Sequence, residues 1–258
     1  MGYLSSQVSN ADLLPTVESA QFFSNRLKQR SVAIALERRR LDTSLLIEIV
    51  LVTIAAILAI GALDSGFLSG AAWFVAPGIL VSAALIPTVI KRRKFAEIGF
   101  NVEQIRDSLV VLGWTCMVVF PAAFFGCWLL KSYGLDLPLR PMLPGGQNWA
   151  CWLFYQFMYV AVAEEVFFRG YVQGNILRLT GTVKLEQYGL KQWLSIALSA
   201  ACFAAAHIVV QGQIISVLTF LPGLILGWLF VRTRSLLAPI LFHGLANICY
   251  FLMVAAFA

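Results

Sequence analysis

Long apolar runs constrain the fold of this chain more than any other feature. Several of them reach or approach the ~20 residues that a helix needs to cross a bilayer. Of the 258 residues, 60% are hydrophobic and only 12% are charged, which is about half the charge of an ordinary soluble domain. The sequence therefore predicts an all-α fold, a polytopic membrane helix bundle of about seven transmembrane helices, or eight with one more span. The expected spans are about 45–62, 67–90, 108–130, 149–168, 193–210, 214–231 and 236–257.

The placement of lysine and arginine predicts the topology. Residues 1–44 form a polar segment, in which we expect a short amphipathic helix on the membrane surface, and residues 45–258 form the transmembrane domain. With a cytoplasmic N-terminus, seventeen of the nineteen Lys and Arg residues fall on the cytoplasmic side, and Lys131 and Arg140 fall outside. This asymmetry satisfies the positive-inside rule. The net charge of +6 is therefore interpreted as a topology signal, and no nucleic-acid partner is expected.

Residues 162–171, VAEEVFFRGY, place two carboxylates and an arginine after an apolar run. Charged residues are costly in hydrocarbon and often mark function there. Glu165 and Arg169 are four residues apart, so on a helix they share a face and can form an ion pair. Glu164 points about 100° away, which leaves a carboxylate that could act as a general base. The alternative is an ordinary helix end, with Glu164 reaching the cytoplasmic surface.

Both histidines of the chain, His207 and His243, lie in expected spans, and Asn247 follows His243 by four residues. A lone histidine in a membrane helix is more often a packing residue or a hydrogen-bond donor between helices. Here a glutamate pair and a carboxamide accompany the two imidazoles, and such a set could activate water and stabilise an oxyanion. For Glu164 to reach the depth of His207, the fourth span must continue to about residue 179, as a helix of ~32 residues.

Two further features have structural interpretations. Gly223 and Gly227 form a Gly-x-x-x-Gly pair, which predicts close helix packing. Glu48, in the first expected span, is expected to face either a cavity or another helix.

Three motifs follow one another on successive expected helices: EEVFFR (Glu-Glu-x-x-x-Arg), FAAAH (Phe-x-x-x-His) and HGLAN (His-x-x-x-Asn). With them, the chain resembles the CAAX protease and bacteriocin-processing family of intramembrane proteases, to which the Ras-converting CAAX endoprotease belongs, over about residues 91–250. The segment KRRKFAEIGF adds to the resemblance. The family implies a membrane endopeptidase with an all-helical core and a cavity open to the cytoplasm.

The resemblance also implies roles for the motif residues. Glu164 and His207 would activate the hydrolytic water. His243 and Asn247 would stabilise the oxyanion. The structural support of the site would come from Glu165, Arg169 and Phe203.

No cofactor is expected, although zinc is an alternative. Two histidines and a glutamate are zinc ligands in other sites. However, Asn247 is a poor zinc ligand, and the chain has no His-Glu-x-x-His pair. Water activation by Glu164 without a metal is therefore the favoured interpretation.

The predicted function is an intramembrane endopeptidase that hydrolyses a peptide bond of a membrane-associated or lipidated protein or peptide. The alternative is a non-catalytic membrane partner, such as a bacteriocin-immunity or scaffold protein, that binds a peptide or lipid in the same cavity. A proton or ion transporter is disfavoured because no inverted repeat is present. The expected partners are a peptide or protein substrate and the lipid bilayer, and the expected location is the bacterial plasma (inner) membrane. The sequence leaves open the oligomeric state and whether the substrate is prenylated.

Overall fold

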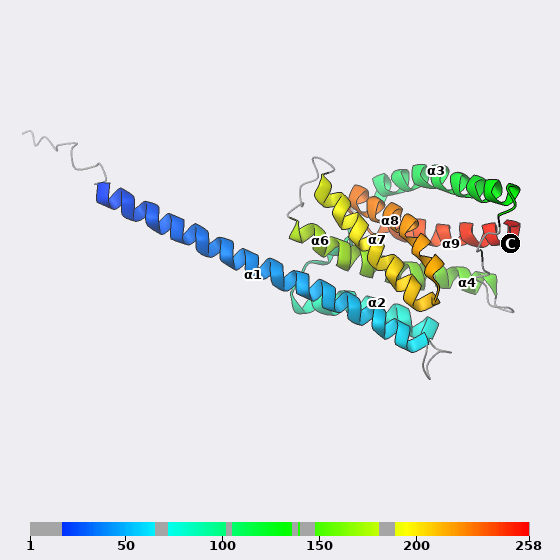
Figure 1. Ribbon diagram of the computed structural model, residues 1–258, viewed down its shortest axis with the longest axis horizontal. Coiled ribbons are helices and arrows are strands. Elements are labelled where there is room, and N and C mark those ends of the chain that lie inside the picture. Colours follow the sequence, from blue (N-terminus) through cyan, green and yellow to red (C-terminus); the bar gives the residue numbers. More distant parts are fainter. Residues whose placement is uncertain are drawn as a thin grey trace, which may run out of the picture. The chain divides into compact units, whose positions relative to one another are not determined.

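The computed structural model describes residues 17–64, 72–101, 105–135, 139, 148–180 and 189–257. The chain divides into two compact units, Met1–Leu45 and Leu46–Ala258. Throughout the described residues the regular structure is helical and contains no strand (Figure 1). The predicted all-α membrane bundle is thereby confirmed.

The helices follow one another along the chain. The first four elements are α1 (Val17–Asp64), α2 (Ala72–Ile90), a 3-10 helix (Phe95–Ile98) and α3 (Ile105–Ser132). A long helical segment, Trp149–Leu179, comes next. The last four elements are α7 (Leu190–Gln211), a 3-10 helix (Ile214–Thr219), α8 (Phe220–Thr233) and α9 (Leu237–Phe257).

In the described part of the chain, six helices are long and apolar enough to cross a membrane. They are Arg39–Leu63, Ile105–Ser132, Trp149–Leu179, Leu190–Gln211, Ile214–Thr233 and Leu237–Phe257. The described part of the second expected span, Phe74–Ile90, is a shorter apolar helix. The chain is a multi-pass integral membrane protein.

The N-terminal part of α1 differs from the expected short surface helix. From Val17 onward the described chain belongs to α1, one helix of 48 residues. No glycine or proline occurs between residues 17 and 60, so nothing in the sequence breaks the helix between the polar segment and the first span. Residues 1–16 lie outside the described residues.

The segment Trp149–Leu179 is the centre of the second unit. It contains 31 residues, which confirms the predicted continuation of the fourth span to residue 179. Four of the largest fully buried side chains belong to it: Phe167, Phe168, Arg169 and Tyr171. Arg169, one of the seventeen cations counted on the cytoplasmic side, is therefore a core residue.

Close packing of α8 against α7 follows from the Gly-x-x-x-Gly pair. A Cβ added to Gly223 would lie 3.1 Å from the Cβ of Ala200, and one added to Gly227 would lie 3.1 Å from Cγ2 of Ile196. Only a residue without a side chain lets the two backbones approach this closely. The predicted role of the two glycines is confirmed.

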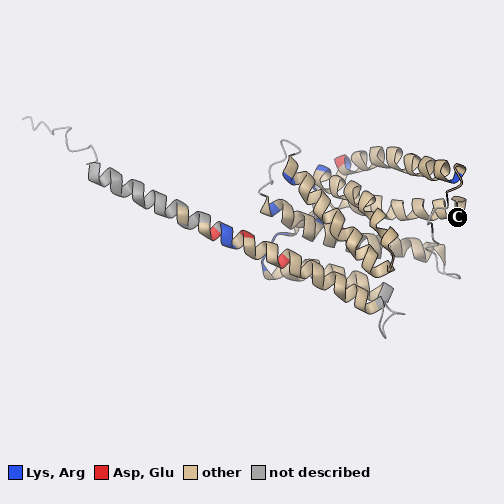
Figure 2. Cartoon of the chain, viewed as in Figure 1, with Lys and Arg blue, Asp and Glu red and all other residues tan. Residues whose placement is uncertain are grey.

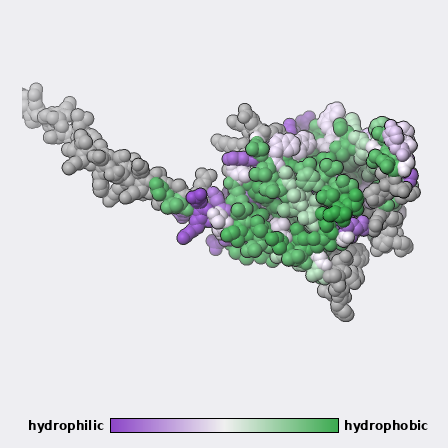
Figure 3. Space-filling model, viewed as in Figure 1, coloured by the Kyte–Doolittle hydropathy of each residue, from purple (hydrophilic) through white to green (hydrophobic). Residues whose placement is uncertain are grey.

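The surface of the second unit is apolar at its sides and charged at its ends. Exposed large hydrophobic residues, such as Trp114 and Met117 of α3, point outward, and Figure 3 shows a largely hydrophobic face over the bundle. Most Lys and Arg residues of this unit gather at one end of the bundle, and a further cation lies at the other end, where Lys131 occupies the last turn of α3 (Figure 2). This distribution is typical of a bundle that spans a membrane.

Glu48 faces another helix, which is one of its two expected placements. Its Oε1 lies 2.9 Å from Nη1 of Arg93, and the hydroxyl of Tyr171 donates to the same oxygen at 3.1 Å. Glu48 therefore ties α1 both to the turn after α2 and to the buried segment that carries Arg169.

Candidate active site

The helix that carries the two glutamates is irregular on both sides of them. The α-helical turn α5 (Val162–Glu165) lies between two π-helical stretches, Gln156–Ala161 and Val166–Gln173, which connect it to α4 (Trp149–Tyr155) and α6 (Gly174–Leu179). A π-helix is rare and frequently occurs at functional sites, and its wider turn shifts the side chains that follow it around the axis. Glu165 contacts His243 of α9, which lies 78 residues later in the chain. The rotation of the glutamate helix about its axis therefore decides whether these two side chains meet.

Glu165 is the anion that holds the centre of the site. Its Oε1 accepts a hydrogen bond from Nη1 of Arg169 at 2.9 Å and lies 2.8 Å from Nδ1 of His243. Both side chains of the Glu165–Arg169 pair are fully buried. Two buried charges are tolerated when they are paired in this way, so the predicted i, i+4 ion pair is present.

Arg169 also joins the glutamate helix to α8 and α7. Its Nη2 donates to the carbonyl of Gly223 at 3.2 Å, and its guanidinium lies 4.5 Å from the centre of the Phe203 ring. One turn later, Gln173 donates to the carbonyl of Gly227 at 2.9 Å. The close approach of α8 allowed by its glycines thus brings two backbone carbonyls within reach of the glutamate helix.

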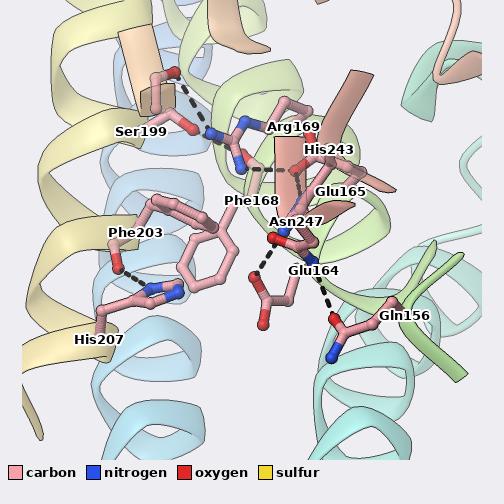
Figure 4. Close-up of polar contacts among 11 residues, drawn as sticks. Gln156, Glu164, Glu165, Phe168, Arg169, Ser199, Phe203, His207, His243 and Asn247 are labelled. Carbon is pink, nitrogen blue, oxygen red and sulfur yellow. Dashed lines mark hydrogen bonds and ion pairs between the residues drawn. The ribbon is translucent and has the colours of Figure 1, made fainter. Parts of the chain in front are cut away.

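His243 lies between the two glutamates. Because its Nδ1 faces Glu165, its Nε2 faces Glu164, with 3.7 Å between Nε2 and Oε2 of Glu164 (Figure 4). The side chain of Glu164 retains 18% exposure, and its Oε2 makes no hydrogen bond with any described residue. Glu164 therefore combines burial, a nearby imidazole and an oxygen that is free to accept a proton.

His207 approaches the site from α7, beyond the ring of Phe203. Its Nδ1 lies 2.9 Å from the carbonyl oxygen of Phe203. A carbonyl oxygen only accepts, so Nδ1 carries a proton, and in the neutral ring this tautomer leaves Nε2 as an acceptor. The Phe203 ring centre lies 4.3 Å from that of His207 and 5.9 Å from that of His243. Phe203 thus contacts both histidines and positions His207 through its backbone carbonyl.

Asn247 has a partner that the sequence did not reveal. Its Nδ2 donates to Oε1 of Gln156 at 2.8 Å (Figure 4). Gln156 is buried in the first π-helical stretch. A signal was present, since Gln156 is a polar residue within the apolar run WLFYQFMYVA, and such residues in membrane helices usually have a partner.

The structure brings the expected residues together in two groups. Glu164, Glu165, Arg169 and His243 form one connected polar group, and Asn247 with Gln156 forms another. Within the described residues, neither His207 nor Asn247 makes a direct hydrogen bond or ion pair with Glu164. A water molecule or a substrate would have to connect them.

Neighbouring residues fix the backbone around the site. Ser199 of α7 donates its hydroxyl hydrogen to the carbonyl of Phe168 at 2.8 Å, within the second π-helical stretch. A Cβ on Gly170 would lie 2.8 Å from the carbonyl oxygen of Ile98, and one on Gly244 would overlap the ring of Phe157. The residues directly after Arg169 and His243 are therefore glycines because other elements occupy the space of a side chain.

The described residues do not provide a ligand set for zinc. Among the described residues, no group of three or more His, Cys, Asp and Glu side chains is placed to hold a metal ion. His243 already uses Nδ1 for Glu165, and His207 lies beyond Phe203. We therefore derive no step of the reaction through a metal.

The fold and the site define a class of protein: a polytopic helical membrane protein whose interior holds paired glutamates, two histidines and a carboxamide. Residues 146–249 match the protein-family model described as type II CAAX prenyl endopeptidase Rce1-like. This part of the chain is similar to the CAAX prenyl endopeptidases, in agreement with the resemblance carried by the three motifs, and all three motifs lie within it. No match was found among curated proteins or among solved structures.

Proposed function

We propose that the chain is an active intramembrane endopeptidase in which Glu164 activates the hydrolytic water. The observation that carries this proposal is the position of Glu164. It lies beside the paired Glu165 and Arg169, and its Oε2 lies 3.7 Å from Nε2 of His243 and accepts no hydrogen bond from the described chain. Burial without a hydrogen bond is costly for a carboxylate, and a group that tolerates this cost is a candidate for chemistry.

The first step is the attack of water on the peptide carbonyl. Glu164 accepts one proton of the water, while the water oxygen forms a bond to the carbonyl carbon and the carbonyl oxygen becomes an oxyanion. His207 presents Nε2 as an acceptor and can hold the second hydrogen of the same water. This arrangement matches the roles that the family resemblance implies for Glu164 and His207.

His243 and Asn247 supply the donors for the oxyanion. Asn247 uses one hydrogen of Nδ2 for Gln156, and its second hydrogen is available. His243 uses Nδ1 for Glu165, so Nε2 can donate only when the ring carries both protons. In that form two carboxylates face one guanidinium and one imidazolium, and the buried site has no net charge, which is the least costly state in a low dielectric.

The second step is the collapse of the tetrahedral intermediate. The carbon–nitrogen bond breaks, the oxyanion returns to a carbonyl, and Glu164 gives its proton to the leaving amine. One water is consumed, and a new carboxyl end and a new amino end form. Glu164 returns to its starting state.

The substrate class follows from the location of the site. Glu165 and Arg169 are fully buried in a helix long enough to cross a membrane, so we expect the scissile bond to belong to a peptide or protein held at the membrane, with or without a lipid group. The gathered cations in Figure 2 favour the corresponding end of the bundle as the cytoplasmic side. The N-terminus would then be cytoplasmic, and we propose a bacterial plasma membrane location.

The test is a comparison of wild type, Glu164→Gln and Glu37→Gln in the native host. Glu37 is exposed on α1 and serves as a matched control for the same chemical change. Mass spectrometry of membrane-protein termini and released peptides should show cleavages with wild type and Glu37→Gln that disappear with Glu164→Gln at equal protein level. Cleavage retained by Glu164→Gln would overturn the mechanism. Absence of any cleavage, with the host phenotype supported by Glu164→Gln, would instead indicate a non-catalytic membrane partner.

A further inference from the structure

An apolar groove lies between α1 and α2, and none of the residues assigned to hydrolysis lines it. It has a volume of about 650 Å³, and its walls come from α1 residues around Val52, Ala56 and Ala59 and from α2 residues between Phe74 and Pro87. Among the described lining residues, only Ser82 has a polar side chain. An open apolar groove of this kind on a membrane protein fits a hydrocarbon chain.

The length of the groove fits one leaflet of a bilayer. Thirteen residues separate Phe74 from Pro87, which corresponds to about 20 Å along a helix. Half of the hydrocarbon core of a bilayer is about 15 Å thick. A chain lying along the groove could therefore reach from the membrane surface toward the middle of the bilayer.

Cations mark one end of the groove. The lining residues Ile86 and Pro87 lie directly before the end of α2 at Ile90, and Lys91, Arg92 and Lys94 follow with exposed side chains. Glu48, one turn before Val52 on α1, pairs with Arg93 and so places the beginning of the groove on α1 beside the same turn. Arg93 is neutralised by Glu48, whereas Lys91, Arg92 and Lys94 have no ion-pair partner among the described residues.

The turn after α2 holds these cations in a defined geometry. The backbone N–H of Arg92 donates to the carbonyl of Val89, and that of Arg93 donates to the carbonyl of Thr88, both at 2.9 Å. Arg92 adopts a positive φ of 50°, where glycine would be the usual residue. The chain thus places an arginine in a backbone conformation that favours a glycine, five residues after the last lining residue, Pro87.

We propose that this groove binds an anionic phospholipid, with one acyl chain between α1 and α2 and the headgroup phosphate at Lys91 and Arg92. Apolar contact supplies binding for any phospholipid. The uncompensated cations select the anionic headgroup, because lysine and arginine near a membrane surface attract anionic lipids. This binding does not depend on peptide hydrolysis.

The charge part of the proposal has a matched control elsewhere in the chain. Arg234 ends α8 with a positive φ of 52°, and Arg232 precedes it as an exposed cation. The variant pair is Lys91→Gln with Arg92→Asn, and the control pair is Arg232→Gln with Arg234→Asn. Asparagine tolerates the positive φ at both positions, so each pair removes two charges and keeps its turn.

The groove part also has a matched control. A Cβ added to Gly78 on α2, or to Gly113 on α3, meets no atom within 4 Å. Gly78→Leu extends a side chain into the groove from a Cβ that meets no neighbouring atom, and Gly113→Leu makes the same change on a different helix. Neither glycine touches the hydrolytic residues.

The experiment is native mass spectrometry of the full-length protein in detergent, titrated with phosphatidylglycerol or with phosphatidylcholine of the same acyl chains. We expect wild type to prefer phosphatidylglycerol, and Lys91→Gln with Arg92→Asn to weaken that binding about 30-fold, or about fivefold per cation. Gly78→Leu should weaken binding of both lipids at this site. The two control variants and Glu164→Gln should change binding less than about twofold, and a photoreactive acyl chain should label residues of α1 and α2.

Three results would overturn the proposal. Equal affinity for the two lipids would show that the cations do not select a headgroup. If Lys91→Gln with Arg92→Asn and Arg232→Gln with Arg234→Asn weaken phosphatidylglycerol binding equally, the effect is only a general attraction of the lipid to surface cations. Displacement of phosphatidylglycerol by a lipidated peptide, together with loss of peptide cleavage in Gly78→Leu, would assign the groove to a substrate's lipid group instead.

Discussion

Nδ1 of His243 lies 2.8 Å from Oε1 of Glu165, the same oxygen that accepts a hydrogen bond from Arg169. One carboxylate atom therefore orients an imidazole and neutralises a buried guanidinium. The first task concerns the reaction and the second concerns stability. Because they fall on one residue, single mutants of Glu165 lose both, and a double mutant is needed to separate them.

The variant Glu165→Gln should lower stability by about 3–5 kcal/mol, because Arg169 stays buried without a counter-charge. Arg169→Ala should likewise lower the yield of folded protein. Glu165→Leu combined with Arg169→Met should recover most of the stability, since apolar residues can replace a buried ion pair at little cost. Thermal unfolding in detergent measures these changes.

The double mutant Glu165→Leu with Arg169→Met should not hydrolyse peptide although it folds, because His243 has lost the acceptor of its Nδ1 proton. Peptide hydrolysis, measured at equal amounts of folded protein, checks this expectation. Activity near that of wild type would show that Glu165 serves the fold alone.

The variant His207→Ala should lower kcat by about 10²–10⁴-fold, the range that a general acid–base group contributes. Yield and thermal stability should change little, because His207 is only partly buried and its Nδ1 bonds a carbonyl of its own helix. Val210→Ala, an exposed position of the same helix, controls for truncation of a side chain on α7. If His207→Ala retains activity within about twofold, Glu164 holds the water without an imidazole.

Hydropathy and spacing predicted most of the fold and the local part of the site. The apolar runs place the spans, because hydrocarbon requires each backbone to satisfy its hydrogen bonds within a helix. The Glu165–Arg169 pair follows from a four-residue spacing on one helix. Both inferences use neighbours along the sequence.

Hydropathy and residue spacing could not predict contacts between helices that are far apart in the sequence. The pairing of Asn247 with Gln156 and of Glu48 with Arg93 depends on how each helix is rotated about its axis. Two π-helical stretches alter that rotation on the glutamate helix, and apolar composition does not reveal them. For the same reason the sequence left Glu164 without a partner, although Nε2 of His243 lies 3.7 Å away.

The variant Gly244→Ala should destabilise the protein by about 1–3 kcal/mol, the usual cost of inserting a methyl group into a filled core. The added Cβ would overlap the ring of Phe157. Gly126→Ala, where no atom lies within 4 Å of the new Cβ, should leave stability unchanged or raise it slightly because alanine favours a helix. Thermal unfolding of the two variants provides the comparison, and equal behaviour would contradict the tight packing of α9 at His243.

Gln156 and Asn247 offer the sharpest test of the oxyanion donors. Asn247→Ala should lower kcat by about 10²–10³-fold, as expected for removal of one such donor. Gln156→Leu should lower kcat about tenfold or more with little change in KM, because the carboxamide of Asn247 loses the acceptor that orients it. If Gln156 acts only through Asn247, the double mutant Gln156→Leu with Asn247→Ala should be no slower than Asn247→Ala alone. Kinetics of the four proteins on one identified substrate complete the cycle. Additive losses would mean that Gln156 contacts the substrate or supports the site by a separate route.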